Sequence, residues 1–192
     1  WKKHFDSYIY PCLIQEYITY PIELGILFYR FPSGKTGITS IVGKRFLSVI
    51  GNGNETLEQL LSKEVRASKR MDYLKDKFAT NWNKVIEKDK EIILEEIGNH
   101  NRGTAFLNFN HLINDDLIAV MDDITKGIEG FHYGRIDLKC NTIEELNKGE
   151  KIKIMEINGV ASEAAHIYDP EMTLLKAYRD VFNNNEIIFK IS

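Results

Sequence analysis

Two short apolar segments carry polar residues at alternate positions: Arg135 and Asp137 in the first, and Glu156 and Asn158 in the second. Successive side chains of a β-strand point to opposite faces, so the two polar residues of each segment share a face and the apolar residues share the other. The pattern predicts two strands that bury one face in a core and present acids and amides on the other face.

If these two strands pair side by side, the carboxylates of Asp137 and Glu156 and the amide of Asn158 converge on one face. Oxygen ligands without His or Cys suit Mg²⁺, which commonly completes its shell with substrate phosphates. The sequence therefore predicts a magnesium site with a nucleotide as co-ligand. The alternative is a solvated strand face, since a metal site demands more than proximity of two acids.

Composition narrows the classes of function. The chain has 192 residues, 43% hydrophobic and 28% charged, which is long enough for one core. Its 25 basic and 28 acidic residues give a formal charge of −3, so we expect no nucleic acid as partner. Cys12 and Cys140 are far apart and have no CxxC spacing, and the start has no signal-like apolar stretch. We therefore expect a cytoplasmic protein without a membrane partner.

Hydrophobic periodicity predicts alternating strands and helices. Strands are predicted at 12–18, 22–29, 38–50, 92–94, 134–138 and 154–158. Helices are predicted at 55–61, 71–85, 115–127, 142–146 and 170–182, with Asn54 or Thr56 and Asn114 as N-caps. No internal repeat occurs, so the sequence predicts one α+β (α/β) unit with a mixed or antiparallel sheet.

Four motifs follow one another along the chain. They are Gln15-Glu16-Tyr17-Ile18, Ile22-Glu23-Leu24-Gly25, Gly134-Arg135-Ile136-Asp137 and Met155-Glu156-Ile157-Asn158. In this order they resemble the C-terminal part of the ATP-grasp superfamily, nearest to carboxylate–amine ligases similar to D-alanine–D-alanine ligase and cyanophycin synthetase. The resemblance covers about residues 12–180, and it depends on the order of the motifs rather than on any single one.

The resemblance implies a single C-terminal ATP-grasp subdomain with a largely antiparallel sheet flanked by helices. Within residues 1–192 it implies a remnant of an upstream segment at 1–11, a hinge and β-rich part at 12–54, a helical insertion at 55–90 and a metal-binding core at 91–192. The first nucleotide-binding lobe of the family lies upstream of the hinge, so the chain is expected to be a fragment that lacks this lobe.

The resemblance also implies how ATP is held. Gln15, Glu16, Tyr17 and Ile18 match the hinge, whose backbone reads the adenine. Glu23 matches an acid that accepts hydrogen bonds from the ribose hydroxyls, and its alternative role is that of an exposed strand acid.

Asp137, Glu156 and Asn158 match the family's Mg²⁺ ligands. Mg²⁺ would neutralise charge during phosphoryl transfer. Arg135 matches an arginine that faces the acyl-phosphate intermediate or a substrate carboxylate, where a planar fork of donors fits. A structural salt bridge is the alternative for Arg135.

Further nucleotide contacts are implied at Lys44, Asn99 and Arg102. Lys44 lies where relatives often place a phosphate-contacting lysine, although edge-strand lysines are commonly only solubilising. Asn99 and Arg102 belong to a glycine-punctuated loop that resembles a phosphate-covering loop, and a solvated turn is its alternative. His100 and His166 are expected to pack or cap.

The segment after the metal asparagine departs from the D-alanine ligases. Those ligases usually continue through Ser-Pro-Gly, whereas this chain has Gly159-Val160-Ala161-Ser162-Glu163. This segment would border the acceptor pocket, so D-alanine specificity is not implied.

The implied reaction is ADP-forming ligation. A carboxylate attacks the ATP γ-phosphate to give an acyl phosphate, and an amine then displaces phosphate. The implied substrates are small, amino-acid-like carboxylates and amines, with ATP and Mg²⁺ as cofactors, and the chain alone is expected to turn over poorly. Two alternatives remain open from the sequence: a noncatalytic nucleotide-binding or interaction module, and an ATP-dependent phosphotransferase or carboxylase-like relative. A homo-oligomer is also possible.

Overall fold

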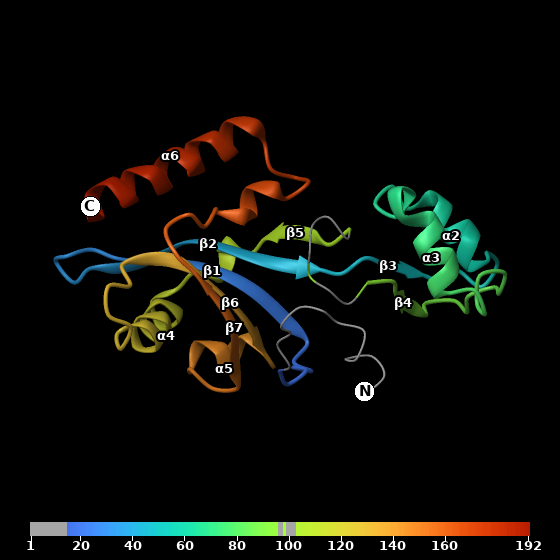
Figure 1. Ribbon diagram of the computed structural model, residues 1–192, viewed down its shortest axis with the longest axis horizontal. Helices are drawn as coiled ribbons and strands as arrows, with labels where there is room; N and C mark the ends of the chain where they lie inside the picture. Colours follow the sequence, from blue (N-terminus) through green and yellow to red (C-terminus); the bar gives the residue numbers. More distant parts are fainter. Residues whose placement is uncertain (1–14, 96–97, 99–102) are drawn as a thin grey trace, which may run out of the picture.

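The computed structural model describes residues 15–95, 98 and 103–192. Its centre is a five-stranded sheet in the order β5-β2-β1-β6-β7, and every neighbouring pair is antiparallel (Figure 1). The strands are β1 (Ile22–Arg30), β2 (Thr36–Arg45), β5 (Ala105–Asn108), β6 (Tyr133–Cys140) and β7 (Ile152–Asn158). Helices flank this sheet, so the predicted α+β class with a largely antiparallel sheet is confirmed.

One face of the sheet is covered by α4 (Asp115–Thr125) and α5 (Ile143–Asn147). Asn114 and Thr142 cap these helices, each accepting a hydrogen bond from a backbone N–H three residues on. The covered face forms the main core, which consists of Leu24, Ile26, Phe28, Ile38, Ile41, Leu117, Met121, Ile136, Leu138, Cys140 and Leu146. Every second residue of the central strands therefore points away from α4 and α5 toward the opposite face.

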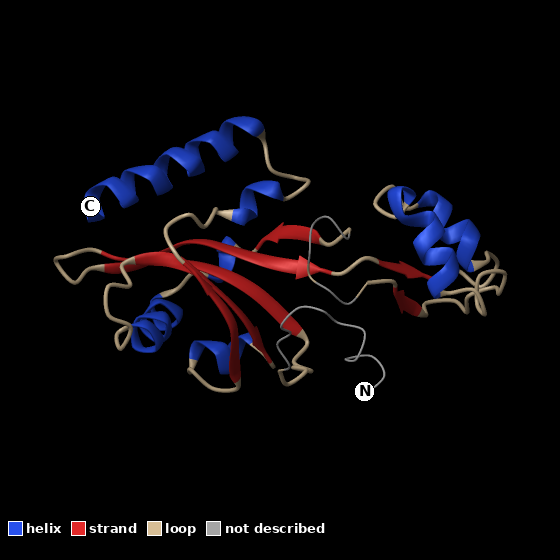
Figure 2. Cartoon of the chain, in the orientation of Figure 1, coloured by secondary structure: helices blue, strands red, loops and turns tan. Residues whose placement is uncertain are grey.

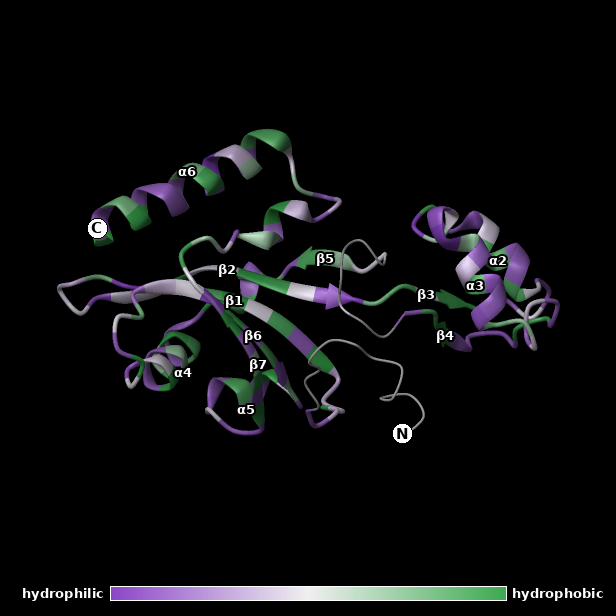
Figure 3. Ribbon diagram, in the orientation of Figure 1, coloured by the Kyte–Doolittle hydropathy of each residue, from purple (hydrophilic) through white to green (hydrophobic). Residues whose placement is uncertain are grey.

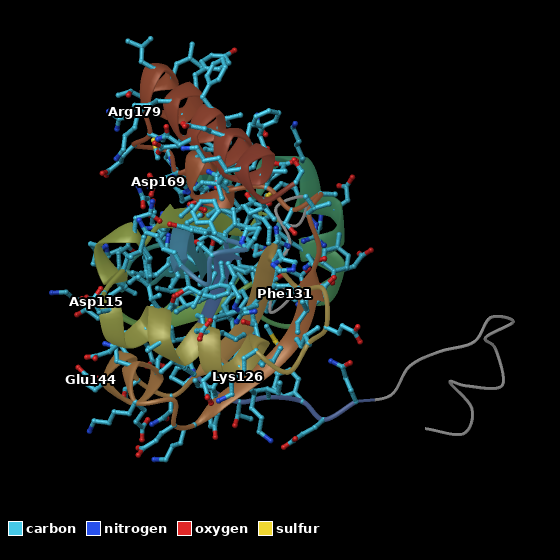
Figure 4. The ribbon with its side chains drawn as sticks, turned by 90° about the vertical axis from the view of Figure 1, so that its left-hand side faces the viewer. Asp115, Lys126, Phe131, Glu144, Asp169 and Arg179 are labelled. Atoms are coloured by element: carbon cyan, nitrogen blue, oxygen red, sulfur yellow. The ribbon has the colours of Figure 1, made fainter. Side chains whose placement is uncertain are left out.

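The opposite face is covered at one end by α6 (Leu174–Ile191) and the short 3₁₀ turn η4 (Ala165–Tyr168). In Figure 4, Arg179 marks α6 on one side of the sheet, and Asp115 and Lys126 mark the two ends of α4 on the other. Leu27, Tyr133 and Ala164 form the buried centre of this layer. The other end of the same face carries the predicted polar residues.

The segment between β2 and β5 forms a unit with its own core (Figure 2). It consists of β3 (Ser48–Ile50), α2 (Leu57–Lys63), η1 (Ser68–Arg70), α3 (Met71–Lys77) and β4 (Glu91–Ile93), and η3 (Asn110–Leu112) follows β5. Thr56 caps α2 through a capping box with Gln59. Its core is separate from the main core and includes Leu57, Leu61, Leu74, Trp82 and Leu94.

Several predicted boundaries are wrong. The predicted helix 71–85 ends at Lys77, and turns follow, because the apolar spacing that predicted a longer helix is also satisfied by a buried Trp82 in a turn. The predicted strand 38–50 is broken before Ser48, where the chain leaves the main sheet. The last helix begins at Leu174 rather than at Pro170 and continues to Ile191. Of the predicted strand 12–18, residues 15–18 are described and have no regular structure.

None of the helices in the described part of the chain has the length and apolar character needed to cross a bilayer.

Candidate functional site

The polar residues of β6 and β7 face one another on the sheet. Asp137 pairs with Glu156 of β7 and, on its other side, with Gly25 of β1. Arg135 pairs with Asn158 in the same ladder. The structure thus brings together all four residues on which the sequence prediction rests.

A β-bulge in β7 sets this pairing. Leu138 pairs with Ile154 and Asp137 with Glu156, so Met155 has no partner in the ladder. A bulge adds one residue to one strand, and a change of one residue in register moves side chains to the other face. The bulge is visible in the sequence as two adjacent apolar residues, Ile154 and Met155. Strict alternation of polar and apolar residues would place only one apolar residue there.

Arg135 and Asp137 form a bidentate ion pair. The Nε atom of Arg135 lies 2.7 Å from Oδ1 of Asp137, and an Nη atom lies 3.1 Å from Oδ2. Asp137 is 5% exposed. Gly25 makes room beneath the pair, because a Cβ atom there would lie 2.9 Å from Oδ1 of Asp137 and 3.2 Å from Cδ of Arg135.

Glu156 and Asn158 complete the predicted cation site. Glu156 is exposed opposite the buried Asp137. The side-chain nitrogen of Asn158 is buried and finds no hydrogen-bond partner in the described part of the chain. Oxygen and nitrogen of an amide exchange by a flip, so this orphaned position fits an amide oxygen turned toward a cation.

The donor set is one buried carboxylate, one exposed carboxylate and one amide. No group of three His, Cys, Asp or Glu side chains among the described residues could hold a metal. A set of this kind fits Mg²⁺, which is commonly bound through one or two carboxylates and takes its remaining ligands from water and phosphate. The residues present therefore fit the predicted ion.

Glu23 lies one step further along the same face and is enclosed by cations. Its Oε1 atom lies 2.7 Å from Nζ of Lys44, and its Oε2 atom lies 3.8 Å from Nζ of Lys139. A Cβ atom on Gly98 would lie 2.7 Å from the Glu23 carboxylate, so the Gly98 backbone passes directly over this pair. Glu23 is therefore not an exposed strand acid, and Lys44 is not a solubilising surface lysine.

The predicted hinge reaches this end of the face. Nζ of Lys139 donates to the carbonyl oxygen of Ile18 at 3.2 Å and lies 5.7 Å from the centre of the Tyr17 ring. Glu16 pairs with Lys153 on β7 at 3.3 Å. Gln15 is exposed. Residues 15–18 therefore lie beside the Glu23 end of the sheet, although they form no strand.

The site residues are arranged as a row along β6. Lys139, Asp137 and Arg135 occupy alternate positions, so their Cα atoms span roughly 13 Å at ~3.3 Å per residue. The cavity in the middle of this row has a volume of about 300 Å³. Val42, Lys44, Gly98, Phe106, Arg135, Asp137, Glu156 and Ala165 line it.

A second cavity of about 540 Å³ adjoins the first at Arg135 and Phe106. Its wall includes the segment from Gly159 to Glu163, which departs from the D-alanine ligase pattern. The hydroxyl of Tyr168 donates to the carboxylate of Glu163, and this hydrogen bond raises the pKa of Tyr168.

His166 makes two polar contacts beside this wall. It is fully buried, its Nδ1 atom lies 2.7 Å from the Ser40 hydroxyl, and its Nε2 atom lies 3.0 Å from Oδ2 of Asp180. Ser40 is 1% exposed, so its hydroxyl is closed to substrates. The His166 ring therefore links β2 to α6 and holds the wall of the second cavity.

The sequence prediction missed Lys139 and Gly25. Lys139 continues the alternate positions of Arg135 and Asp137 on β6, which is a signal that the sequence contains. Asn99 and Arg102, as well as His100, lie outside the described residues, so their predicted roles stay predictions.

No protein-family model matches the sequence, and no curated protein matches it. Among solved structures, the chain is similar to a bifunctional glutathione synthetase from Pasteurella multocida, with a TM-score of 0.56 and 13% sequence identity. The similarity covers 87% of this chain and 24% of that one. The likeness establishes a shared fold. Membership of the ATP-grasp superfamily and the nearer resemblance to D-alanine–D-alanine ligase and cyanophycin synthetase stay predictions.

Proposed function

We propose that this chain supplies the magnesium- and phosphate-binding face of an ATP-dependent, ADP-forming carboxylate–amine ligase. The observation that carries the proposal is the register of β6 and β7, which sets Asp137 opposite Glu156 and Arg135 opposite Asn158. The fold shared with a part of a bifunctional glutathione synthetase supports the proposal, because that protein is itself a synthetase.

The acids and the amide of the site have separate roles in such a reaction. Asp137 and Glu156 would hold Mg²⁺ together with the amide of Asn158, and the ion, when bound, neutralises charge on the phosphates. Glu23 would accept hydrogen bonds from the ribose hydroxyls. Because Glu23 lies two residues from Gly25, the partner of Asp137, the ribose and metal positions are separated by about 7 Å along the strand.

Arg135 is the residue that would face the reacting carboxylate. Its guanidinium group is positioned by Asp137 and lines both cavities. A planar fork of donors binds a carboxylate or acyl phosphate more specifically than a point charge does. Since an ionised carboxylate offers about four lone-pair positions, Asp137 can keep Arg135 in place and still ligate a cation.

The larger cavity is the proposed site of the amine substrate. Lys44 does not line it, and its lining residues include Glu163, Phe106 and Ala165. A negative group in a largely apolar wall favours an amino-acid-like amine over a neutral or anionic acceptor.

The proposal also includes a second nucleotide-binding lobe. This chain spans about a quarter of the synthetase that shares its fold. In the proposal, the row of residues on this sheet contacts one side of the nucleotide only, so the chain alone binds ATP weakly and turns over slowly. Robust ligase activity from the 192-residue chain would contradict this part.

The experiment compares Mg²⁺-dependent ATP binding by the chain and by its Asp137→Asn and Glu156→Gln variants, using calorimetry. Both variants should lose the Mg²⁺-dependent part of the binding. Glu156→Gln, at an exposed position, should keep the thermal midpoint within a few degrees, whereas Asp137→Asn should lower it because it breaks the buried ion pair with Arg135. Glu91→Gln, an exposed acid on β4, is the matched control and should bind as the unchanged chain does. Unchanged Mg²⁺-dependent binding in Asp137→Asn would refute the metal assignment.

Turnover is tested in the full-length protein with ATP, Mg²⁺ and pooled carboxylates and amines. Release of ADP that requires both a carboxylate and an amine supports ligation. ADP release with a single phosphorylated product would indicate a phosphotransferase instead.

A noncatalytic module is the second candidate, and one observation favours it. The two buried acids of the site already face cations, Asp137 with Arg135 and Glu23 with Lys44. Such pairs could serve the fold alone. ATP binding without any nucleotide turnover in the full-length protein would support this candidate.

A further inference from the structure

The helix α6 alternates hydrophobic and hydrophilic residues along its length (Figure 3), and several of its apolar side chains are exposed to solvent. Its most exposed apolar side chains are Leu174 (72%), Leu175 (86%), Tyr178 (59%), Phe182 (73%) and Phe189 (81%). At 100° per residue these five positions lie within about a third of the helix circumference. We refer to these five residues as the α6 outer face. Contiguous apolar surfaces of this kind mark interaction sites.

The orientation of α6 is fixed by polar contacts on its inner side. Oδ2 of Asp180 lies 3.0 Å from Nε2 of the buried His166. The side-chain oxygen of Asn184 accepts hydrogen bonds from Thr39 at 2.6 Å and from Tyr133 at 3.2 Å. Rolling the helix to bury its outer face would leave these buried groups without partners, and it would expose Ile187, Ile188 and Ile191, which pack against the layer beneath α6. The apolar face is therefore held outward.

The spacing of the outer face is that of a helix–helix seam. Leu175, Tyr178, Phe182 and Phe189 follow steps of three, four and seven residues, and the seven-residue step contains the exposed Asn185 at the missing position. Alternating steps of three and four residues place side chains along the contact line of two parallel or antiparallel helices.

Asn185 indicates what kind of helix fits. A single polar residue in an apolar seam fixes the register, because it is stable there only when it meets a polar group. In a parallel pair of identical helices, Asn185 meets the Asn185 of the other copy. If the two helices ran antiparallel and overlapped along their whole length, Asn185 would lie against the ring of Tyr178 of the other copy. The amide would then have a poorer hydrogen-bond partner than a second amide. The seam therefore favours a second copy of the same helix in parallel orientation.

The exposed area agrees with an interface of modest size. The three aromatic rings and two leucines of the α6 outer face expose roughly 400–700 Å² in each copy. The largest apolar patch on a typical monomer is ~300–600 Å², and a standard interface buries ~800 Å² per partner. The outer face overlaps the first range and falls short of the second value, so the association is expected to be weak and to depend on protein concentration.

We propose that the chain forms a two-fold homodimer through a parallel pairing of α6 with the α6 of a second copy. The contact lies on the outer side of α6, and the row of site residues lies on the sheet behind it. The dimer therefore leaves the cavities beside Arg135 accessible, and its formation is independent of the proposed ligase function.

The first test measures the mass of the chain in solution over a series of concentrations by sedimentation equilibrium. A reversible monomer–dimer equilibrium is expected. Phe182→Glu should weaken it by about 100-fold or more, because each copy loses a buried ring and gains a buried charge. Val65→Glu is the matched control, since Val65 is an apolar residue of comparable exposure (83%) in the insertion, and it should leave the equilibrium unchanged. A strictly monomeric unchanged chain overturns the proposal.

The second test addresses the orientation of the two helices. Asn185→Cys in a Cys12→Ser background should give a disulfide-linked dimer under mild oxidation, because a parallel pair sets the two introduced thiols side by side. A mixture of Asn185→Cys and Tyr178→Cys chains should yield little of the mixed dimer. If the mixed dimer predominates, the pairing is antiparallel and the proposed arrangement is wrong. Circular dichroism confirms that each variant is folded.

Discussion

Replacement of Gly25 by alanine should weaken binding at the proposed cation site much more than it lowers the stability of the sheet. The new Cβ atom would lie 2.9 Å from Oδ1 of Asp137 and 2.9 Å from a methyl carbon of Val42. Ordinary contacts begin at 3.4 Å, so each neighbour must move by about 0.5 Å (3.4 − 2.9). β1 is paired on both sides and cannot withdraw, so the side chains have to move.

The cost in stability should be small. Overpacking costs ~1–3 kcal/mol, and removal of a glycine from a strand returns ~0.5–1 kcal/mol. The net change in the free energy of unfolding is therefore about 0–2.5 kcal/mol. The effect on ligand binding should be larger, since a displacement of ~1 Å in a preorganised site can cost ~100-fold and half that displacement about tenfold.

The assay is Mg²⁺-dependent ATP binding together with urea denaturation. Gly25→Ala should bind about tenfold more weakly than the unchanged chain. Gly127→Ala is the control, because a Cβ atom there meets nothing within 4 Å. Adding Val42→Ala relieves one of the two close contacts but leaves Asp137 displaced, so it should recover stability and not binding. If Gly25→Ala binds ATP and Mg²⁺ as tightly as the control, the position of Asp137 does not determine binding and the reasoning fails.

Three further predictions concern stability. Lys44→Met should lower the free energy of unfolding, measured in urea, by about 3 kcal/mol, because among the described residues the buried Glu23 keeps only the more distant Lys139 as a cation; adding Glu23→Gln should recover part of the loss. Trp82→Ala should cost about 3–5 kcal/mol in the insertion alone, so proteases should cut within residues 55–90 while the five-stranded sheet stays intact; simultaneous loss of both cores would contradict this. Burial, aided by Glu145, raises the pKa of the Cys140 thiol from 9.0 to about 11, so above pH 9 the unfolded chain releases a proton that the folded chain keeps. Stability should therefore fall as the pH rises from 9 toward 11, and a Cys140→Ala variant whose pH profile is just as steep would refute this assignment.

The sheet and most of its strands could be predicted from local patterns. Alternation at Arg135 and Asp137 identified β6, and Asn114 identified the start of α4. The end of α3 could not be predicted in this way, because Trp82 satisfies the apolar spacing of a helix while its burial comes from packing against a separate core.

The site could be predicted as a set of residues but not as a set of contacts. The pairing of Asp137 with Glu156 depends on the register of two strands, which local sequence does not determine. The enclosure of Glu23 by Lys44 and Lys139 joins three strands from distant parts of the chain. His166 was predicted to pack or cap, whereas its hydrogen bonds to Ser40 and Asp180 arise only when α6 settles beside β2.

Because of the bulge at Met155, β7 should tolerate the loss of one residue there better than the gain of one residue further along the strand. Deletion of Met155 would leave Glu156 opposite Asp137 and Asn158 opposite Arg135, because Met155 is the residue without a partner. An insertion between Glu156 and Asn158 would instead separate the amide from Arg135. Shortening of this strand by one residue at Met155 is therefore compatible with an unchanged site, whereas lengthening by one residue beyond Glu156 is not.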